Sequence, residues 1–190
     1  RRIGVGFTGL GNTLSMLCLR YDREDGREMA ARIAERMRNA AYRASVELAK
    51  EKGAFPKFDA AAYLGGGSFA SRLPDDIKDG IKKYGLRNSH LLSIAPTGTV
   101  SLAFADNASN GIEPAFSWSY TRKKRESDGS TSEYTVEDHA YRLYHALHGT
   151  TRDTPLPAYF VNALEMTAAD HVAMMQAVQP YIDTSISKTV

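Results

Sequence analysis

The chain has 190 residues, of which 43% are hydrophobic and 24% are charged, and its formal net charge is +2 at pH 7. These values are ordinary for a globular protein with one substantial core, and they give no reason to expect a nucleic-acid or membrane partner. Cys18 is the only cysteine, which excludes an internal disulfide and a CxxC metal or redox pair. No apolar run approaches the roughly 20 residues that span a bilayer, and no signal-peptide pattern opens the sequence, so we expect a cytoplasmic location.

The first half of the chain is predicted to be mostly helical. Between Glu24 and Lys52, apolar or small residues recur every three or four positions and a glycine follows, which is typical of a long amphipathic helix. Arg1–Gly6 is too short to classify. The other elements expected here are a helix over 8–19, a glycine-rich loop from 53 to 74, a short helix over 75–84 and a buried strand over 89–95.

The second half mixes strands and helices. Residues 117–124 are predicted to form a strand, and 134–136 to pair back onto it across the turn signal Asp128-Gly129. Thr167 and Asp170 indicate the start of a helix, because the two side chains can cap it together. The other predicted elements are a first helical turn over 100–105, helices over 136–147 and 168–178, and a closing strand over 185–190. This order predicts an α/β fold made of several consecutive units of a larger barrel or sheet.

Residues 1–190 are expected to form a single partial domain. No repeat, low-complexity tract or linker divides the sequence. It opens at Arg1 without a methionine and closes on an alternating, strand-like run with no turn after it. We therefore interpret the chain as a piece of something longer.

A glycine motif near the start matches the dinucleotide-binding fingerprint G-x-G-x-x-G. The match is Gly4-Val5-Gly6-Phe7-Thr8-Gly9, with a predicted helix after it. The fingerprint also needs a strand before it and, about 20 residues later, a second strand that ends in an acid. Because the next predicted element is the long helix from Glu24, we favour glycines that permit close packing at a helix start.

The stretch Pro96-Thr97-Gly98-Thr99 lies between the predicted buried strand and a helix start. The first amides of a helix have no partners within the helix and together carry about half a positive charge, so a turn of this kind binds phosphate. Thr97 and Thr99 would add hydroxyl donors, and Gly98 would let the backbone approach the ligand closely. The residues alone leave a second interpretation open, in which Thr97 or Thr99 only caps the helix.

Three further features are interpreted as structural. His139, His145 and His148 fall on one predicted helix, where their spacing permits metal ligation, but a solvated helix face is favoured because nothing else indicates a metal. The basic run Arg122–Arg125 is interpreted as a charged strand edge. Cys18 is interpreted as a small buried hydrophobe, because apolar residues flank it.

Four segments carry a resemblance to a known family: "RRIGVGFTGLGNTLSMLCLRYD", "RNSHLLSIAPTGTVSLAFADNASNGIEPAF", "SYTRKKR" and "QPYIDTSISKTV". Together they resemble the C-terminal half of the catalytic barrel of ribonucleotide reductase, in its adenosylcobalamin-dependent class. The resemblance covers nearly the whole chain. Its most specific parts are the Pro-Thr-Gly-Thr turn, the Asn-Gly-Ile-Glu-Pro run after it and the closing Ile-Ser-Lys-Thr.

The resemblance implies part of a ten-stranded α/β barrel in a cytoplasmic enzyme of deoxyribonucleotide biosynthesis for DNA replication. It implies adenosylcobalamin as cofactor, a ribonucleotide as substrate, and nucleotide effectors, a thioredoxin-like reductant and a second copy of the chain as partners. The family's turn that holds the substrate phosphates at a helix N-terminus matches Pro96, Thr97, Gly98, Thr99 and Val100, which favours the anion-site interpretation. In some relatives the residue matching Gly98 is an acid and the residue matching Val100 bears a hydroxyl. Because valine has no side-chain donor, Val100 would offer only its backbone amide.

The radical chemistry of the family cannot be placed on this chain. The family forms a thiyl radical on a cysteine flanked by an asparagine and a glutamate, and it reduces the ribose with a pair of redox cysteines. Cys18 lies in a different context, so the resemblance assigns no catalytic residue to this chain. It implies that the radical loop lies before Arg1 and that the fragment alone is inactive. Relatives that receive their radical from a partner subunit carry a tyrosine pair on the last strand; Ser185–Lys188 has none, which fits the cobalamin class, and Tyr181 is interpreted as packing.

Two alternatives stay open beside this hypothesis. One is a non-catalytic nucleotide-binding or assembly module that reuses this half of the barrel. The other is a glycyl-radical enzyme, which would need a glycine-radical loop near its C-terminus, and none is visible before Val190.

Overall fold

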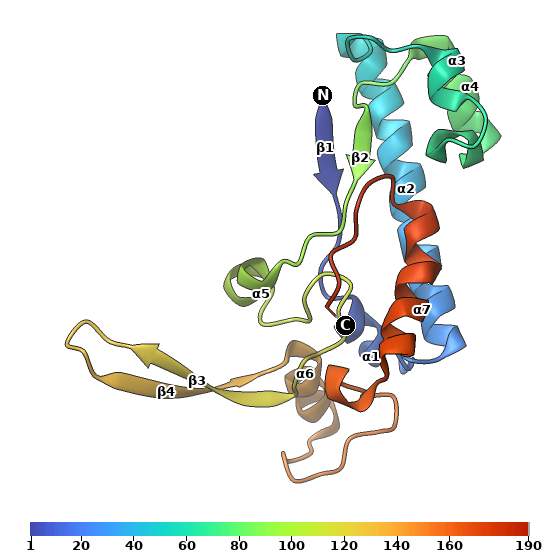
Figure 1. Ribbon diagram of the computed structural model, residues 1–190. Helices are drawn as coiled ribbons and strands as arrows, with labels where there is room; N and C mark the ends of the chain where they lie inside the picture. Colours follow the sequence, from blue (N-terminus) through green and yellow to red (C-terminus); the bar gives the residue numbers. More distant parts are fainter. Residues whose placement is uncertain (190) are drawn as a thin grey trace. The chain divides into compact units, whose positions relative to one another are not determined.

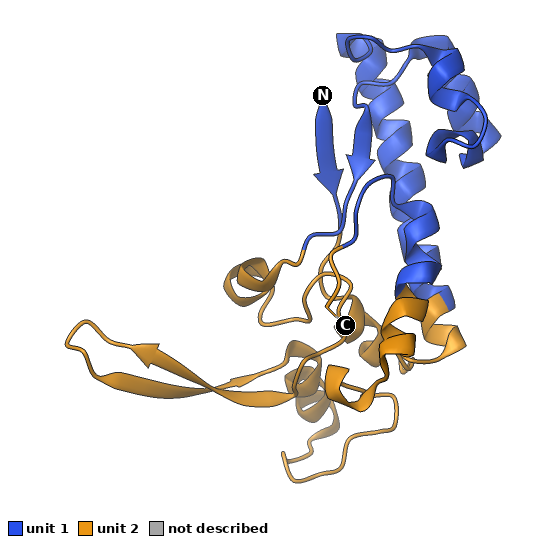
Figure 2. Ribbon diagram, viewed as in Figure 1, with its two compact units in different colours: residues 1–6, 28–95, 175–186 blue, residues 7–27, 96–174, 187–190 orange. Residues whose placement is uncertain are grey.

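The computed structural model describes residues 1–189, which form two compact units. Unit 1 comprises residues 1–6, 28–95 and 175–186, and unit 2 comprises residues 7–27, 96–174 and the residues that follow 186 (Figure 2). Within the described part of the chain, no helix is both long and apolar enough to cross a membrane.

Unit 1 combines a parallel strand pair with helices. Strands β1 (Arg2–Val5) and β2 (His90–Leu92) pair in parallel, and a further parallel bridge joins Ile94 to Ile186 (Figure 1). The helices of this unit are α2 (Glu24–Lys52), of which residues 28–52 lie in unit 1, α3 (Ala60–Leu64) and α4 (Asp75–Tyr84), with 3₁₀ turns at Phe69–Arg72 and Gln179–Tyr181.

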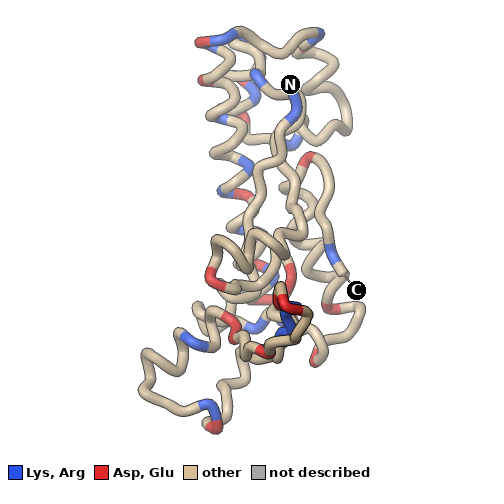
Figure 3. The backbone as a smooth tube through the Cα atoms, turned by 90° about the vertical axis from the view of Figure 1, so that its left-hand side faces the viewer, with Lys and Arg blue, Asp and Glu red and all other residues tan. Residues whose placement is uncertain are grey.

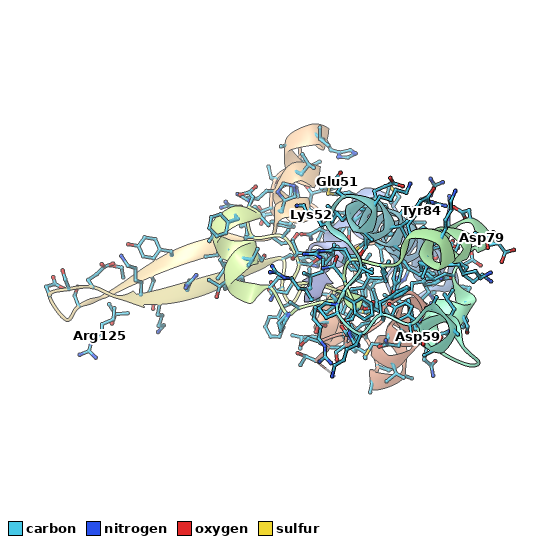
Figure 4. All side chains as sticks on the ribbon, turned by 90° about the horizontal axis from the view of Figure 1, so that it is seen from above. Glu51, Lys52, Asp59, Asp79, Tyr84 and Arg125 are labelled. Carbon is cyan, nitrogen blue, oxygen red and sulfur yellow. The ribbon has the colours of Figure 1, made fainter. Side chains whose placement is uncertain are left out.

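The long helix α2 organises the core of unit 1 because its buried hydrophobic residues recur at helical spacing. They are Ala30, Ala34, Tyr42, Val46 and Ala49. Val46 lies so close to α4 that a Cβ on Gly80 would come within 3.2 Å of it. Acidic and basic residues both occur along α2 (Figure 3), and some of them pair, as Glu47 and Lys50 do at 2.7 Å. At the C-terminal ends of α2 and α4, Lys52 and Tyr84 point outward (Figure 4).

A half-buried carboxylate completes the edge of β2. Asp183 accepts hydrogen bonds from the amides of Leu91 and Leu92, both at 2.8 Å, and from the Tyr42 hydroxyl at 2.7 Å. The carboxylate thus takes the place of a neighbouring strand for two backbone donors. Burial raises the pKa of Tyr42, which keeps its hydroxyl a donor to Asp183.

Unit 2 contains short helices and one hairpin. Its elements are α1 (Leu10–Met16), α5 (Gly98–Phe104), β3 (Ser119–Arg125), β4 (Thr131–Glu137), α6 (His139–His148), a 3₁₀ turn at Ala163–Glu165 and the first seven residues of α7 (Ala168–Val178). The antiparallel hairpin β3–β4 extends away from the other elements of unit 2 (Figure 1), and Arg125 points away from it (Figure 4).

Most of the predicted elements are confirmed. Helices α2, α4 and α7 have the predicted bounds, the hairpin forms, and Thr167 and Asp170 cap α7 reciprocally. Helix α6 begins at His139 rather than Val136, because the preceding residues pair with β3 and Asp138 caps the helix. The mixed helix and strand content agrees with the predicted α/β class.

Some predictions were incomplete or wrong. The unclassified segment at the N-terminus contains β1, and the predicted loop over 53–74 contains α3 and a 3₁₀ turn. The predicted closing strand makes only the bridge at Ile186 within residues 1–189, and Val190 lies outside the described residues.

The interpretation of Cys18 as a buried hydrophobe is wrong, because its side chain is exposed. Cys18 follows the C-cap of α1 with φ of 59°, and its amide donates to the Ser15 carbonyl at 3.0 Å. The next amide, of Leu19, donates to the Leu14 carbonyl at 2.9 Å. This is a Schellman motif, in which the left-handed residue ends the helix.

Candidate functional site

A cavity of unit 2 has a volume of about 670 Å³ and takes its wall from segments far apart in the sequence. The wall combines exposed apolar side chains, of which Leu102, Phe116 and Leu164 are the largest, with polar groups. The polar groups come from Asn107, Ser109, Asn110, Glu113, Asp138, His171 and Thr189. A mostly apolar pocket with a few fixed polar groups is the usual form of a small-molecule site.

Gly98 joins the predicted phosphate turn to this cavity, because it is the one residue of Pro96–Val100 that lines the wall. It lies beside Asn110, whose Nδ2 would be 3.6 Å from a Cβ at this position. Pro96, Thr99 and Val100 are exposed, and Thr97 is half-buried.

The first turn of α5 leaves its amides unused. No residue within 1–189 accepts a hydrogen bond from the amides of Gly98, Thr99 or Val100; the first bond that closes the helix runs from Ser101 N to Thr97 O at 2.7 Å. Thr97 is the N-cap residue, with φ of 55°, and its side chain makes no capping bond. The interpretation that Thr97 caps the helix with its hydroxyl is therefore wrong.

The Thr97 hydroxyl instead fixes the turn to its neighbours. Thr97 Oγ1 accepts from the Gly111 amide at 2.8 Å and lies 2.8 Å from Thr8 Oγ1. Thr8 Oγ1 also lies 3.2 Å from the Ser109 carbonyl oxygen, to which it can donate. When Thr8 donates to the Ser109 carbonyl, the Thr97 hydroxyl donates to Thr8. The Thr97 hydroxyl is then engaged within the protein, and the donors that the turn offers to a ligand are backbone amides.

A buried network holds the loop that follows α5. Asn12 Nδ2 donates to both carboxylate oxygens of Asp138, at 2.8 and 2.9 Å, and Asn12 Oδ1 accepts from the Ser109 amide at 2.7 Å. Asp138 Oδ1 also accepts from the first amides of α6, those of Ala140 and Tyr141. One asparagine thus joins α1, the cavity loop and α6.

Burial raises the pKa of the Asp138 carboxyl, and the hydrogen bonds from Asn12 and the α6 amides act in the opposite direction. The carboxylate is 3% exposed and lies in the cavity wall. Both of its oxygens accept hydrogen bonds from the protein, which makes it a structural group of the site.

The other residues considered from the sequence lie apart from this turn. His139 Nδ1 pairs with Asp106, His145 Nδ1 with the Thr150 hydroxyl, and His148 Nδ1 with the Tyr144 carbonyl, so each histidine has a different partner. Residues 1–189 contain no cluster of three or more metal-ligating side chains. The basic run lies on β3, whose residues are all exposed.

The glycines of the N-terminal motif serve close packing, as favoured from the sequence. A Cβ on Gly6 would lie 2.2 Å from the Ser93 carbonyl oxygen, and one on Gly4 would lie 2.8 Å from the Ser93 hydroxyl. The motif is followed by α1 and then α2, without the second strand of a dinucleotide fold.

The family described as "Ribonucleotide reductase, barrel domain" matches residues 1–190. The chain belongs to this family. The vitamin B12-dependent ribonucleoside-diphosphate reductase of Mycobacterium tuberculosis (strain CDC 1551 / Oshkosh) is 31% identical over 210 residues, which cover 100% of this chain and 27% of that protein. The protein of the same name from Thermoplasma acidophilum is 27% identical over 204 residues, which cover 100% of this chain and 24% of that protein.

A relative with a different name matches a smaller part. The ribonucleoside-diphosphate reductase large chain of Encephalitozoon cuniculi is 33% identical over 132 residues, covering 65% of this chain and 17% of that protein. The resemblance to ribonucleotide reductase is thus confirmed, and the relatives that match the whole chain carry vitamin B12 dependence in their names. The chain spans about a quarter of the length of these curated relatives.

Several residues of the ribonucleotide reductase cavity gave no separate signal in the sequence. Asp138 and His171 belong to no motif, and Asn12 lies in the first of the four segments that carry the resemblance without a role of its own there. Glu113 and Lys188 fall in the recognised runs Asn-Gly-Ile-Glu-Pro and Ile-Ser-Lys-Thr, but nothing in those runs indicates that the two side chains meet, as they do in the structure. Their pairing arises from the fold.

Proposed function

We propose that the full-length protein is a cobalamin-dependent ribonucleotide reductase, which reduces ribonucleotides to deoxyribonucleotides by a thiyl-radical mechanism. In this proposal residues 1–190 form a single partial domain, the C-terminal portion of a ten-stranded α/β barrel. The family match over the whole chain and the names of the full-coverage relatives support the proposal. The alternative of a non-catalytic module is not favoured, because these relatives are named as reductases.

The specific role that we propose for this chain is to bind the substrate phosphates at Pro96–Val100. The observation that carries it is the set of three unused amides of Gly98, Thr99 and Val100 at the start of α5, beside a cavity large enough for a small ligand. Unpaired amides at a helix start attract an oxyanion through their hydrogens and through the helix dipole. Val100 contributes an amide and no side-chain donor.

The cofactor and partners follow from the family. Adenosylcobalamin would supply the radical when bound to the full-length protein. Because Cys18 is the only cysteine of this chain, the radical and redox cysteines belong to other parts of the full-length protein. We also propose a cytoplasmic location for the full-length protein. Its partners in this proposal are nucleotide effectors, a thioredoxin-like reductant and a second copy of the chain.

Replacing Thr99 by proline tests the phosphate turn. Proline removes the amide hydrogen of residue 99 but fits the first turn of a helix, and the glycine before it relieves the steric conflict. Thr99→Ala is the matched control, since it removes the hydroxyl and keeps the amide. A hydrogen bond to a charged group contributes about 1.5–3 kcal/mol, so T99P should weaken the binding of a ribonucleoside diphosphate by about 10- to 150-fold relative to T99A.

The measurement is the dissociation constant of the full-length protein for the diphosphate and for the matching nucleoside without phosphates. The proposal expects T99P to weaken the diphosphate and to leave the nucleoside unchanged. Equal diphosphate binding by T99P and T99A would contradict it.

A further inference from the structure

A buried lysine lies beside the cavity, in a cluster that the phosphate turn does not use. The Lys188 side chain is 1% exposed. Its Nζ donates to Glu113 Oε2, to His171 Nδ1 at 2.6 Å and to the Thr189 carbonyl at 2.9 Å. An ammonium group has three hydrogens, and these three acceptors use all of them. Lys188 therefore has no hydrogen left for a ligand.

Glu113 anchors the lysine in this position. Its second oxygen, Oε1, accepts from the Thr189 amide at 2.7 Å, so both carboxylate oxygens are engaged. The ion pair compensates the charge of a lysine that has almost no contact with solvent, which a buried charge requires. Glu113 and Thr189 also line the cavity, together with His171.

The contact with Lys188 decides which nitrogen of His171 carries the proton. An ammonium only donates, so Nδ1 accepts and the ring proton lies on Nε2. His171 is 7% exposed. Its Nε2 has no hydrogen-bond partner within residues 1–189. Nε2 is also absent from the fully buried unpartnered atoms of these residues, so solvent or a ligand can reach it. The imidazole thus keeps one free N–H donor, on a residue that lines the cavity.

We propose that His171 binds an oxygen of the ribose or base of the nucleotide through Nε2–H, and that Lys188 and Glu113 are positioning residues that fix this tautomer. The inference rests on the proposed function, because it takes the nucleotide as the occupant of the cavity. A neutral N–H donor suits a hydroxyl or carbonyl oxygen, whereas the amides of α5 suit the charged phosphates. In this proposal the α5 amides bind the phosphates of the nucleotide, and His171 binds its ribose or base.

Nitrogen NMR of the full-length protein, labelled with ¹⁵N-histidine, tests the tautomer directly. We expect His171 Nε2 to show the shift of a protonated ring nitrogen and Nδ1 that of an unprotonated one. Lys188→Met should abolish this preference. A proton on Nδ1 in the unmodified protein would overturn the proposal, whatever the variants do.

Two substitutions of His171 separate its two nitrogens. The amide of asparagine takes the place of Nδ1 and retains an acceptor for Lys188, but it has no group at Nε2. The amide of glutamine reaches the place of Nε2 and retains the donor. His171→Asn should raise the dissociation constant for a ribonucleoside diphosphate by about 2- to 12-fold, the effect of one neutral hydrogen bond, and His171→Gln should recover part of the loss. Equal binding by H171N and the unmodified protein would overturn the proposal.

The nucleoside without phosphates distinguishes this proposal from the phosphate turn. H171N should weaken the nucleoside and the diphosphate by the same factor, whereas T99P should weaken only the diphosphate. If H171N weakens the diphosphate alone, His171 contacts phosphate and the assignment to ribose or base is wrong. If T99P has no effect and H171N weakens both ligands, the phosphate turn fails and the histidine site stands.

Discussion

Exchanging the two polar partners of the buried network tests whether it holds the cavity loop. The structure has an amide at position 12 and a carboxylate at position 138, with Asn12 Nδ2 donating to both oxygens of Asp138. The variants are Asn12→Asp, Asp138→Asn and the double variant with both changes. In the double variant, the carboxylate at position 12 accepts a hydrogen bond from the Ser109 amide and another from the side-chain NH₂ group at position 138. The side-chain oxygen at position 138 still accepts from the α6 amides. Each donor again meets an acceptor.

The single variants break this complementarity in different ways. In D138N, the oxygen of the new side chain stays at the Oδ1 position, where the α6 amides donate, so its NH₂ group faces the NH₂ group of Asn12 at the 2.9 Å contact. An unsatisfied buried donor costs about 1–3 kcal/mol. In N12D, two carboxylates share the space, which costs at least as much because like charges this close do not both ionise. Asn12 cannot rotate to compensate in D138N, because its Oδ1 accepts from Ser109 at 2.7 Å.

Hydrogen exchange of the peptide that covers residues 106–112 measures the effect in the full-length protein, since local opening limits exchange there. D138N should speed the exchange of the Ser109 amide about 5- to 150-fold, and the double variant should return it to within about fivefold of the original rate. A peptide from α4, in unit 1, should not change in any variant. If the double variant exchanges as fast as the product of the two single effects, the residues are not coupled and the reasoning is refuted.

Three further predictions concern single positions. Gly6→Ala should destabilise the protein strongly, because its Cβ would lie 2.2 Å from the Ser93 carbonyl oxygen; Gly66→Ala, with no atom within 4 Å, is the control in a thermal-unfolding comparison. Cys18→Gly should stabilise by about 1 kcal/mol in urea titrations and Cys18→Ala should not, because only glycine relieves the φ of 59°. Burial raises the pKa of Asp138 in the folded protein above its unfolded value of about 3.9. The stabilisation that this shift gives is complete below the unfolded pKa and is lost as the pH rises through the folded pKa. The stability of the unmodified protein relative to D138N should therefore decrease with rising pH, and a constant difference would show that the shift is absent.

Regular elements with long patterns and the β3–β4 hairpin were predictable from the sequence, whereas a short helix and the turn after α1 were not. Helix α2 has the predicted bounds because 29 residues repeat one apolar spacing. Helix α3 has five residues and buries none of them, so no pattern indicates it. The error at Cys18 has a physical cause: its apolar neighbours suggested burial, but the Schellman turn after α1 places the side chain in solvent.

The site was predictable only in its local part. The turn at 96–100 carries its own signal, since a proline, a glycine and two hydroxyl residues separate a strand from a helix. The contacts that complete the cavity join residues far apart, such as Asn12 with Asp138, 126 positions away, and Glu113 with Lys188, 75 positions away. Single-sequence patterns carry no information on such pairs, because each partner is an ordinary polar residue in its own segment.

Backbone strain gathers at the two ends of α5, next to residues of the cavity wall. Of the five non-glycine residues with positive φ within residues 1–189, three are Thr97, Asp106 and Asn107. Each left-handed residue costs about 1–2 kcal/mol, and each is held by its own contacts: Thr97 by the Gly111 amide, Asp106 by Arg142 and His139, and Asn107 by a bond from Nδ2 to the Glu137 carbonyl at 2.8 Å. Since these partners are all within the protein, the wall forms before any ligand binds. If the proposed nucleotide occupies this cavity, it does not spend binding energy on ordering these residues, because contacts within the protein already hold them.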